Sequence, residues 1–379
     1  MQKIVSKKDL RKEGSMQINR SVIGRKQLSG FYKGKRVLVT GHTGFKGSWL
    51  CRILLDFGAE VHGYALEAPT EPALFEIAGL KKEMHSVIGD IRDLETLTKT
   101  VQEVRPDVIL HLAAQPIVRT SYQDPVGTYE SNVMGTVNIL EQVRQCDSVR
   151  SFLNVTTDKV YENKEWPWGY RENERLDGYD PYSNSKSCSE LVTHSYRKSF
   201  FTKEDGSYTV PISTARAGNV IGGGDFAKDR IVPDCVRAME RKETILVRNP
   251  YSTRPYQHVL EPLSCYLMIA AAQWEDSSIA GAYNVGPDDC DCVTTGELVD
   301  LFCSSYGSGA HWENRAEANA PHEANFLKLD CSKMKSVFGW EPKWHIRQAM
   351  DQVCEWSRAY LEGADCNAVM ERQIRDFFE

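Results

Sequence analysis

A glycine-rich turn directly after an apolar run constrains this sequence most. The run RVLVT at residues 36–40 is short, apolar and β-branched, which is typical of a buried strand, and Gly41, Gly44 and Gly47 follow it at once. Gly41 permits a tight turn, Gly44 lets a pyrophosphate approach the backbone, and Gly47 allows the next helix to pack closely on the strand. The helix N-terminus then offers N–H groups and partial positive charge. The pattern predicts a dinucleotide site.

Strands and helices alternate along the first half of the chain. Apolar runs that predict strands are separated by stretches that predict helices of ten or more residues, and this alternation is typical of a doubly wound parallel sheet. We therefore predict an α/β fold of the Rossmann type. The predicted strands span residues 36–40, 60–66, 106–114, 151–157 and 210–220, and the predicted helices follow a turn over 41–57 and span about 129–145 and 181–203.

This alternation loosens after residue 218, where loop-like stretches separate shorter helices, and we predict a smaller C-terminal substrate-binding domain there. The predicted dinucleotide-binding domain covers residues 30–217 plus about 255–286. The predicted substrate-binding domain covers about 218–254 plus 287–379. Residues 1–29 carry eight Lys and Arg residues against Asp9 and Glu13 and show no apolar helical stripe. They predict a basic, poorly ordered extension.

Charge and composition argue against several classes of protein. The formal net charge of −6 disfavours a nucleic-acid partner. No run approaches the roughly 20 apolar residues of a membrane span, and the start MQKIVSKKDL lacks a signal-peptide core. The 11 cysteines include no CxxC, and Cys290 and Cys292 have no His or Cys partners close in sequence. We expect reduced thiols, a cytoplasmic location and no metal site.

Tyr182 and Lys186 form a candidate acid/base pair. They stand four residues apart in YSNSK and so share one face of the predicted helix. A phenol with a pKa near 10 is a poor base at neutral pH. A neighbouring ammonium favours the phenolate and makes Tyr182 a credible proton acceptor for an alcohol. The alternative is an exposed Tyr/Lys pair with no chemical role.

A second polar group follows the predicted strand at 151–157. Thr157, Asp158 and Lys159 lie just past its carboxyl end, where open α/β sheets place their ligands. If Asp158 acts as an acid, its pKa must be raised, and if Lys159 acts as a base, its pKa must be lowered. A salt bridge between the two would defeat both roles. A structural ion pair at the strand end is therefore the alternative interpretation.

Taken together, these motifs resemble the extended short-chain dehydrogenases/reductases and, within them, the sugar-nucleotide 4,6-dehydratases. The Asp-Lys pair, in place of Asp-Glu, resembles the members that act on cytidine diphosphate-glucose (CDP-glucose). The resemblance covers roughly residues 30–360 and implies deoxysugar biosynthesis, such as that of O-antigen. It rests on VTTDKVY and on GHTGFKGSWL, GYALEAPT, HLAAQP, YRENERLDGYDPYSNSK, RAGNVIGGGDFAKDR, RNPYSTRPYQHVLEPLS and PHEANFLKLDCSK.

The cofactor that the resemblance implies is NAD. Asp90 and Ile91 match the family's contact with the adenine edge, and Lys46 faces either phosphate or solvent. The acid expected near the adenosine ribose is Glu67 by its distance from Gly47, although the strand count points nearer to Ala65. The full set of implied cofactor-binding residues is Gly41, Thr43, Gly44, Phe45, Lys46, Gly47, Asp90, Ile91, Leu112, Ala113, Ala114, Tyr182 and Lys186.

The implied reaction removes water from the sugar in three steps. Tyr182 deprotonates the C4 hydroxyl while NAD oxidises C4, and the resulting ketone acidifies the hydrogen on C5. Lys159 removes that proton or stabilises the enolate, Asp158 protonates the departing C6 hydroxyl, and NADH then reduces C6. The implied catalytic residues are Thr157, Asp158, Lys159, Tyr182 and Lys186.

On the substrate side, the resemblance implies that Asn219 and Arg254 hold the hexose and diphosphate. A guanidinium suits diphosphate oxygens because it binds two of them at once. Arg119, and His322 and Asn325 in PHEAN, are further candidates, with solvated surface positions as the alternative. The nucleotide base follows from the resemblance alone. The resemblance also implies a homodimer packed through the helices at about 129–145 and 181–203.

Three other functions compete with this prediction. A sugar-nucleotide 4-epimerase shares the Tyr/Lys pair and NAD but eliminates nothing, so it has no need of Asp158 and Lys159. Another nucleotide-sugar 4,6-dehydratase would differ only in the base. A non-catalytic, NAD-sensing regulator on the same fold has no need of Tyr182 and Lys186.

Overall fold

The computed structural model describes residues 24–316 and 326–379 and is built around one parallel sheet. Its seven strands follow the order β11-β6-β5-β4-β1-β2-β3, and every neighbouring pair is parallel. This order confirms the predicted doubly wound sheet of the Rossmann type. The strands are β1 Arg36–Thr40, β2 Glu60–Ala65, β3 His85–Ile88, β4 Val108–His111, β5 Ser151–Thr157, β6 Ile212–Ala217 and β11 Ala282–Val285.

The direction of strand order reverses at β1, which fixes where a ligand binds. Thr40 at the end of β1 pairs with Tyr64 of β2 on one side and with His111 of β4 on the other. Ligands of open α/β sheets bind in the crevice beyond the carboxyl ends at such a switch point. The glycine turn after Thr40 therefore borders the expected site.

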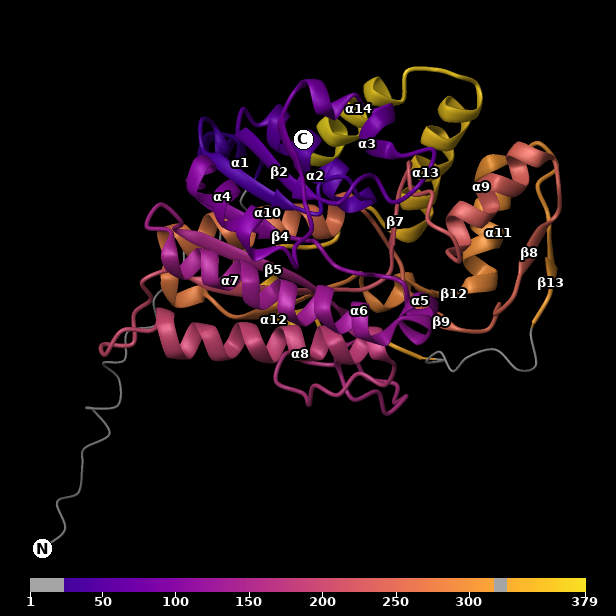
Figure 1. Ribbon diagram of the computed structural model, residues 1–379. Helices are drawn as coiled ribbons and strands as arrows, with labels where there is room; N and C mark the ends of the chain where they lie inside the picture. The colour runs from indigo at the N-terminus through magenta and orange to yellow at the C-terminus, as the bar shows by residue number, and fades with distance from the viewer. Residues whose placement is uncertain (1–23, 317–325) are drawn as a thin grey trace, which may run out of the picture.

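Helices cover both faces of the sheet (Figure 1). One core cluster joins one face of the strands to α1 (Arg25–Tyr32), α2 (Phe45–Asp56) and α10 (Leu260–Glu275). Another joins the opposite face to α4 (Leu94–Val104) and α7 (Gly135–Gln145), against which α8 (Pro181–Tyr196) packs. Side chains alternate between the two clusters along each strand because strand residues point to opposite faces in turn.

A third cluster forms a smaller unit at the other end of the molecule. It is built from α9 (Ile231–Arg241), α11 (Thr295–Tyr306) and α13 (Ile346–Leu361), which stand together in Figure 1. Three pairs of short strands accompany these helices. They are β7 (Val220–Ile221) with β10 (Gln257–His258), β8 (Ile245–Val247) with β13 (Trp312–Asn314), and β9 (Thr253–Pro255) with β12 (Cys292–Thr294).

The predicted boundaries differ from these clusters in two places. Helix α1 begins at Arg25, inside the segment predicted as an extension of residues 1–29, and buries Leu28 in the main core. Residues 1–23 lie outside the described part of the chain. Helices α12 (Ser332–Phe338) and α14 (Cys366–Phe378), which the prediction assigns to the substrate-binding domain, also pack into the main core. The apolar side chains of α12 and α14 are buried against the unit that contains the sheet. The spacing of apolar residues predicts that such helices are buried on one face, but it does not predict which unit covers that face.

The two long helices predicted over about 129–145 and 181–203 are each interrupted by a wider turn. Helix α7 follows α6 (Pro125–Tyr129) through a π-helical turn at Glu130–Met134, and α8 continues through another at Arg197–Phe201. The remaining short helices are α3 (Leu74–Ile77), α5 (Val118–Gln123) and 3₁₀ turns at Leu80–Lys82, Asp158–Val160, Ser277–Ile279 and Asp289–Asp291. Among the described residues, no helix has the length and apolar character that crossing a bilayer requires.

Candidate active site

The turn after β1 has the geometry of a diphosphate cradle. Gly41 has a φ of 77°, and a Cβ there would lie 2.8 Å from the backbone N of Ala113. A Cβ on Gly47 would lie 2.2 Å from the carbonyl oxygen of Gly41, so helix α2 approaches the strand as closely as only glycine allows. Gly44 caps α2 without a side chain, which leaves the first-turn N–H groups to an anion. These residues fit a dinucleotide.

Two neighbouring side chains of the turn have different roles. The Thr43 hydroxyl donates to the Leu66 carbonyl at 2.9 Å and ties the turn to the end of β2. Lys46 lines the pocket beside Asp158 rather than facing bulk solvent. Burial, and next the charge of Arg230, lowers the pKa of Lys46 to about 8, while Asp158 acts in the opposite direction.

The predicted adenosine end is less open than the turn. Arg92 pairs with the Asp90 carboxylate at 2.7 Å and holds the pKa of that carboxyl below its ordinary value. Ile91 is buried against Gly135. Leu112 and the following residue donate backbone N–H groups to the Thr40 hydroxyl, which shapes the floor of the crevice at residues 112–114. Glu67 is exposed beyond β2, so the residue that meets the ribose stays a prediction.

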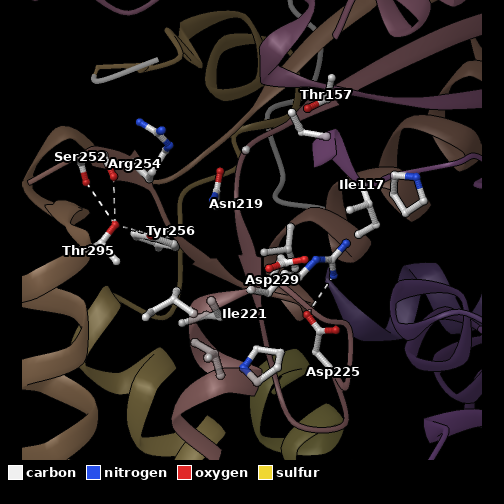
Figure 2. A pocket seen from close by; sticks show the side chains of 18 of the residues that line it. Ile117, Thr157, Asn219, Ile221, Asp225, Asp229, Ser252, Arg254, Tyr256 and Thr295 are labelled. Carbon is white, nitrogen blue, oxygen red and sulfur yellow. Dashed lines mark hydrogen bonds and ion pairs between the residues drawn. The ribbon is translucent and has the colours of Figure 1, made fainter. Parts of the chain in front are cut away.

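One pocket, seen in Figure 2, is lined by four of the five predicted catalytic residues and by the three predicted substrate-binding residues that the structure describes. Helix α8 supplies Tyr182, and the carboxyl end of β5 supplies Thr157 and the two residues after it. The loop before β7 supplies Asn219, and strand β9 supplies Arg254. The described pocket residues that the sequence predicted are Phe45, Lys46, Arg119, Thr157, Asp158, Lys159, Tyr182, Asn219 and Arg254.

Tyr182 and Lys186 are both buried on the inner face of α8. The Lys186 ammonium donates to the Val155 carbonyl of β5 at 3.0 Å and lies behind the pocket wall. Burial raises the pKa of Tyr182 to about 12 and lowers the pKa of Lys186 to about 7. Thr157 and the charge of Arg230 act on Tyr182 in the opposite direction and favour the phenolate. The phenolate form of Tyr182 therefore depends on the polar and cationic groups around it.

Asp158 has the environment of a general acid. It is 1% exposed; its Oδ1 accepts from the Thr157 hydroxyl at 2.9 Å, while its Oδ2 has no hydrogen-bond partner among the described residues. Burial raises its pKa. The positive charges of Lys159 and Arg254 act against that rise without cancelling it. Within the described part of the chain no ion pair joins Asp158 to Lys159, so the arrangement that would defeat both roles is not present.

The substrate side is formed mainly by the smaller unit. Arg254 is 4% exposed and sits in β9, where its backbone pairs with Val293 of β12. Arg119 lies 3.9 Å from Asp229 and borders the same pocket. In Figure 2, Thr295 accepts or donates hydrogen bonds with Ser252 and Tyr256, which closes the end of the pocket beyond Arg254. The predicted residues His322 and Asn325 lie outside the described residues.

Sequence reasoning missed Arg230. Its guanidinium binds Asp225 at 2.9 Å, lines the pocket and acts electrostatically on both Tyr182 and Lys46. The only sequence signal was its place in GGGDFAKDR, a loop at the boundary between the two units. Charge in a loop says nothing about which side it faces, so the fold was needed to find it.

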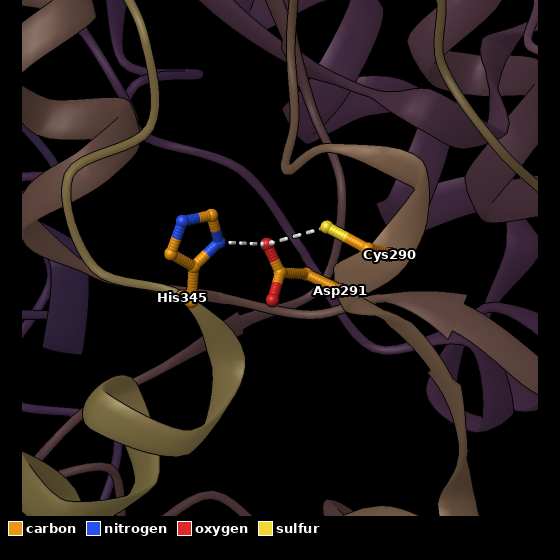
Figure 3. A group of neighbouring side chains, drawn as sticks. All are labelled: Cys290, Asp291 and His345. Carbon is orange, nitrogen blue, oxygen red and sulfur yellow. Dashed lines mark hydrogen bonds and ion pairs between the residues drawn. The ribbon is translucent and has the colours of Figure 1, made fainter.

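A separate group joins Cys290, Asp291 and His345 (Figure 3). No histidine lies near Cys290 in the sequence, and the fold brings His345 to it from 55 residues away. Asp291 accepts from the His345 ring at 2.7 Å and from the Ile346 backbone N–H at 2.9 Å. Both carboxylate oxygens are therefore occupied at the start of α13. We assign this group a helix-capping role.

Comparison with known proteins gives the family. The GDP-mannose 4,6 dehydratase family model matches residues 38–353. CDP-glucose 4,6-dehydratase of Salmonella typhimurium is 49% identical over 92% of this chain and 97% of its own length. The chain belongs to the sugar-nucleotide 4,6-dehydratase family. The predicted resemblance to this family is thereby confirmed.

Other members of the wider superfamily are more distant from this dehydratase. CDP-paratose 2-epimerase of Salmonella typhi is 26% identical over 85% of this chain and 99% of its own. Among solved structures, UDP-glucose 4-epimerase of Thermus thermophilus in complex with NAD has a TM-score of 0.74 at 25% identity, covering 85% of this chain and 99% of that one. The dTDP-glucose 4,6-dehydratase of Bacillus anthracis in complex with NAD has a TM-score of 0.70 at 22% identity, covering 86% and 98%. The last likeness supports the fold alone.

Proposed function

We propose that this chain is an NAD-dependent dehydratase that converts CDP-glucose to CDP-4-keto-6-deoxy-glucose. The observation that carries the proposal is the pocket in which Tyr182, Thr157 and Asp158 stand together beside the glycine turn. The 49% identity to a CDP-glucose 4,6-dehydratase supports the choice of nucleotide. An epimerase would not need a buried carboxyl with a raised pKa at the end of β5.

NAD supplies the two-electron oxidation at the start of the reaction and the matching reduction at its end. Gly41, Gly44 and Gly47 hold its diphosphate at the N-terminus of α2. Tyr182 takes the proton of the C4 hydroxyl, with Thr157 beside the phenol. Arg230 places positive charge near that oxygen and favours the phenolate, and we propose that Lys186, one helical turn further along the same face of α8, adds to this effect.

Elimination then uses the two residues after Thr157. The ketone at C4 makes the C5 hydrogen acidic, and Lys159 takes that proton in its neutral amine form, since an ammonium has no lone pair to accept it. Asp158, held in its protonated form by burial, gives its proton to the departing C6 hydroxyl, which leaves as water. Lys159 returns its proton to C5 when C6 is reduced, and solvent exchange restores the protonation states of Tyr182 and Asp158.

Arginine guanidinium groups that border the pocket hold the diphosphate of the substrate. Arg254 is buried and fixed in a strand, and Arg119 and Arg230 border the same pocket. A diphosphate brings two negative charges into a pocket whose described lining holds more cations than acids: Lys46, Arg119, Lys159, Arg230, Arg248 and Arg254 against Asp158, Asp225, Asp229 and Asp234. This favours a nucleoside diphosphate-linked sugar over a neutral sugar.

The test is to incubate the purified protein and NAD with glucose linked to CDP, dTDP, UDP and GDP, and to measure the products by mass. We expect loss of one water from CDP-glucose at the highest kcat/KM. Faster water loss from another nucleotide would assign a different base. Conversion without a change in mass would point to an epimerase, and NAD binding without turnover of any sugar would support a regulator.

We also propose that the protein is a homodimer in a reducing compartment such as the cytoplasm. Four large apolar side chains are more than half exposed on adjacent segments around α8, which supports a subunit contact there: Val126, Met134, Leu191 and Phe200. All 11 cysteines are unpaired thiols, which is usual in such a compartment. The predicted division into cofactor-binding and substrate-binding domains remains part of the proposal, with α12 and α14 assigned to the former.

A further inference from the structure

Helix α8 presents three chemically distinct groups on its inner face. Tyr182, Lys186 and Glu190 are spaced by four residues and therefore follow one another on successive turns of the same face. All three are at least nine-tenths buried. The proposed reaction uses the first two and leaves the Glu190 carboxylate, a costly group to bury, without a role.

Glu190 is held from two strands of the sheet. One carboxylate oxygen accepts from the Thr156 hydroxyl of β5 at 2.5 Å, and the other accepts from the Thr214 hydroxyl of β6 at 2.8 Å. Arg216, also in β6, donates to that second oxygen at 2.8 Å. Thr156 directly precedes Thr157 and Asp158, so these contacts join the helix of Tyr182 to the strand end that carries the acid.

Arg216 is itself fixed on its far side. Its other terminal nitrogen donates to the Tyr161 hydroxyl at 2.8 Å and to the Glu172 carbonyl at 2.9 Å. Only 4% of its side chain and 3% of the Glu190 side chain are exposed. Burial alone would raise the pKa of Glu190, but Arg216 and the two threonine hydroxyls together lower it, so the carboxylate stays ionised.

The charges that face Lys186 come from three elements. From α2, Lys46 opposes its protonation, and from α8, Glu190 favours it; burial is the largest influence and, with Lys46, lowers the pKa of Lys186 to about 7. From β4, His111 faces the same ammonium, and burial followed by that positive charge lowers the pKa of His111 to about 3. Among the groups that act on Lys186 in the described residues, Glu190 is therefore the anion that favours its protonated form, and it lies one helical turn away.

We propose that Glu190, paired with Arg216, is a positioning residue that keeps Lys186 charged and fixes α8 against the strand end of Thr157 and Asp158. This inference rests on the proposed function, because Lys186 matters only if Tyr182 acts as a base. Glu190 does not touch the substrate. It acts through Lys186, by setting the positive charge that favours the Tyr182 phenolate, and through Thr156, by setting the distance between base and acid.

The test replaces the ion pair as a unit, because removing Glu190 alone would leave the buried Arg216 charge uncompensated. The double variant E190Q/R216M keeps similar volumes. In protein without cofactor, the pH dependence of Lys186 acetylation is followed by mass spectrometry, and we expect its midpoint to fall by about one pH unit. In the loaded enzyme, we expect the acidic limb of kcat/KM for CDP-glucose to move up by a similar amount, with about tenfold lower turnover at pH 7.

Two further variants make the result decisive. R52M/E83Q removes another ion pair with a buried guanidinium, on α2, and should move neither the acetylation midpoint nor the pH profile. E190D retains the negative charge but places it further from Lys186, so it should lower the midpoint of Lys186 acetylation by a smaller amount. If the double variant does not fold, the E190D result tests the proposal instead. A lower thermal midpoint with unchanged titration and pH profile would overturn the proposal and leave Glu190 a structural residue. Acetylation needs no substrate, so absent turnover in the wild type would overturn only the proposed function.

Discussion

The Thr157 hydroxyl donates to Oδ1 of Asp158 at 2.9 Å and turns the other carboxyl oxygen toward Gly218, where a Cβ would lie 3.4 Å from Oδ2. One oxygen of the carboxyl group is thus fixed, and the other is buried at the pocket wall without a hydrogen-bond partner among the described residues. Because burial raises the pKa of this group, it can hold a proton at a defined point beside Tyr182.

The variant D158N should stop elimination without stopping oxidation. Asparagine keeps an acceptor for Thr157 but has no proton to give to the C6 hydroxyl, so we expect product formation to fall by about a hundredfold to ten-thousandfold. A single turnover should still reduce the bound NAD, which absorbance reports. The exposed D177N is the matched control and should turn over at the wild-type rate. Loss of NAD reduction in D158N would place Asp158 in the first step instead.

Replacing Tyr182 by phenylalanine should stop the first step. Y182F retains the ring that packs in the pocket wall and removes the oxygen that accepts the C4 proton, so we expect both NAD reduction and water loss to fall by about a hundredfold or more. The affinity for NAD, measured by titration calorimetry, should change little. Y122F alters a half-exposed tyrosine and serves as the control. A Y182F enzyme with near-normal NAD reduction would contradict the role of the phenol.

Gly41 and Gly79 offer a matched pair for testing the diphosphate turn. Both have positive φ, 77° and 64°, so alanine costs each a similar backbone strain of about 1 kcal/mol. Only at Gly41 would the new Cβ meet other atoms, at 2.8 Å from Ala113 N, whereas nothing lies within 4 Å of a Cβ at Gly79. We expect G41A to abolish measurable NAD binding and G79A to bind normally, each measured by calorimetry. Equal affinities would show that the turn is not the diphosphate site.

Glu261, in the first turn of α10, should make stability depend on pH. Its Oε1 accepts from the backbone of Lys343 and Trp344, but burial outweighs these bonds and raises its pKa from 4.5 to about 7. Between those two pH values Glu261 is ionised in the unfolded chain but still protonated in the folded one. The contribution of Glu261 to the free energy of unfolding is therefore fully present below about pH 4.5. It is lost as the pH rises to 7, by roughly 3 kcal/mol.

The measurement is the free energy of unfolding of wild type and E261Q from denaturant titrations at several pH values. The free energy of unfolding of E261Q should depend less on pH than that of wild type between about pH 5 and 7, because glutamine has no group to ionise there. E297Q removes a carboxylate whose pKa the Thr294 cap lowers, and it should leave that slope unchanged. Parallel curves for wild type and E261Q would refute the assignment.

The sheet could be predicted from sequence because its central strands are buried on both faces and read as continuous apolar runs, as RVLVT does. Strand β3 was not predicted, because its sequence HSVI is short and only partly buried at the edge of the sheet. Tyr182 and Lys186 were found because helical spacing places them on one face. Arg230 was not, since it lies in a loop, and Glu190 was not, since its partners Thr214 and Arg216 lie on another strand and distant pairings leave no local pattern.

Helix α8 carries the reactive phenol on its inner side and Leu191, 55% exposed, on its outer side. This helix has 16 residues, and its Glu190 is hydrogen-bonded to Thr156 of β5 and Thr214 of β6. Because it is closely packed, a displacement of its outer side is expected to move its inner side as well. A contact that displaces Leu191 is therefore expected to change the orientation of the Tyr182 side chain as well. If the proposed homodimer packs against that outer flank, a substitution there that produces a monomer is expected to alter the rate of the reaction as well.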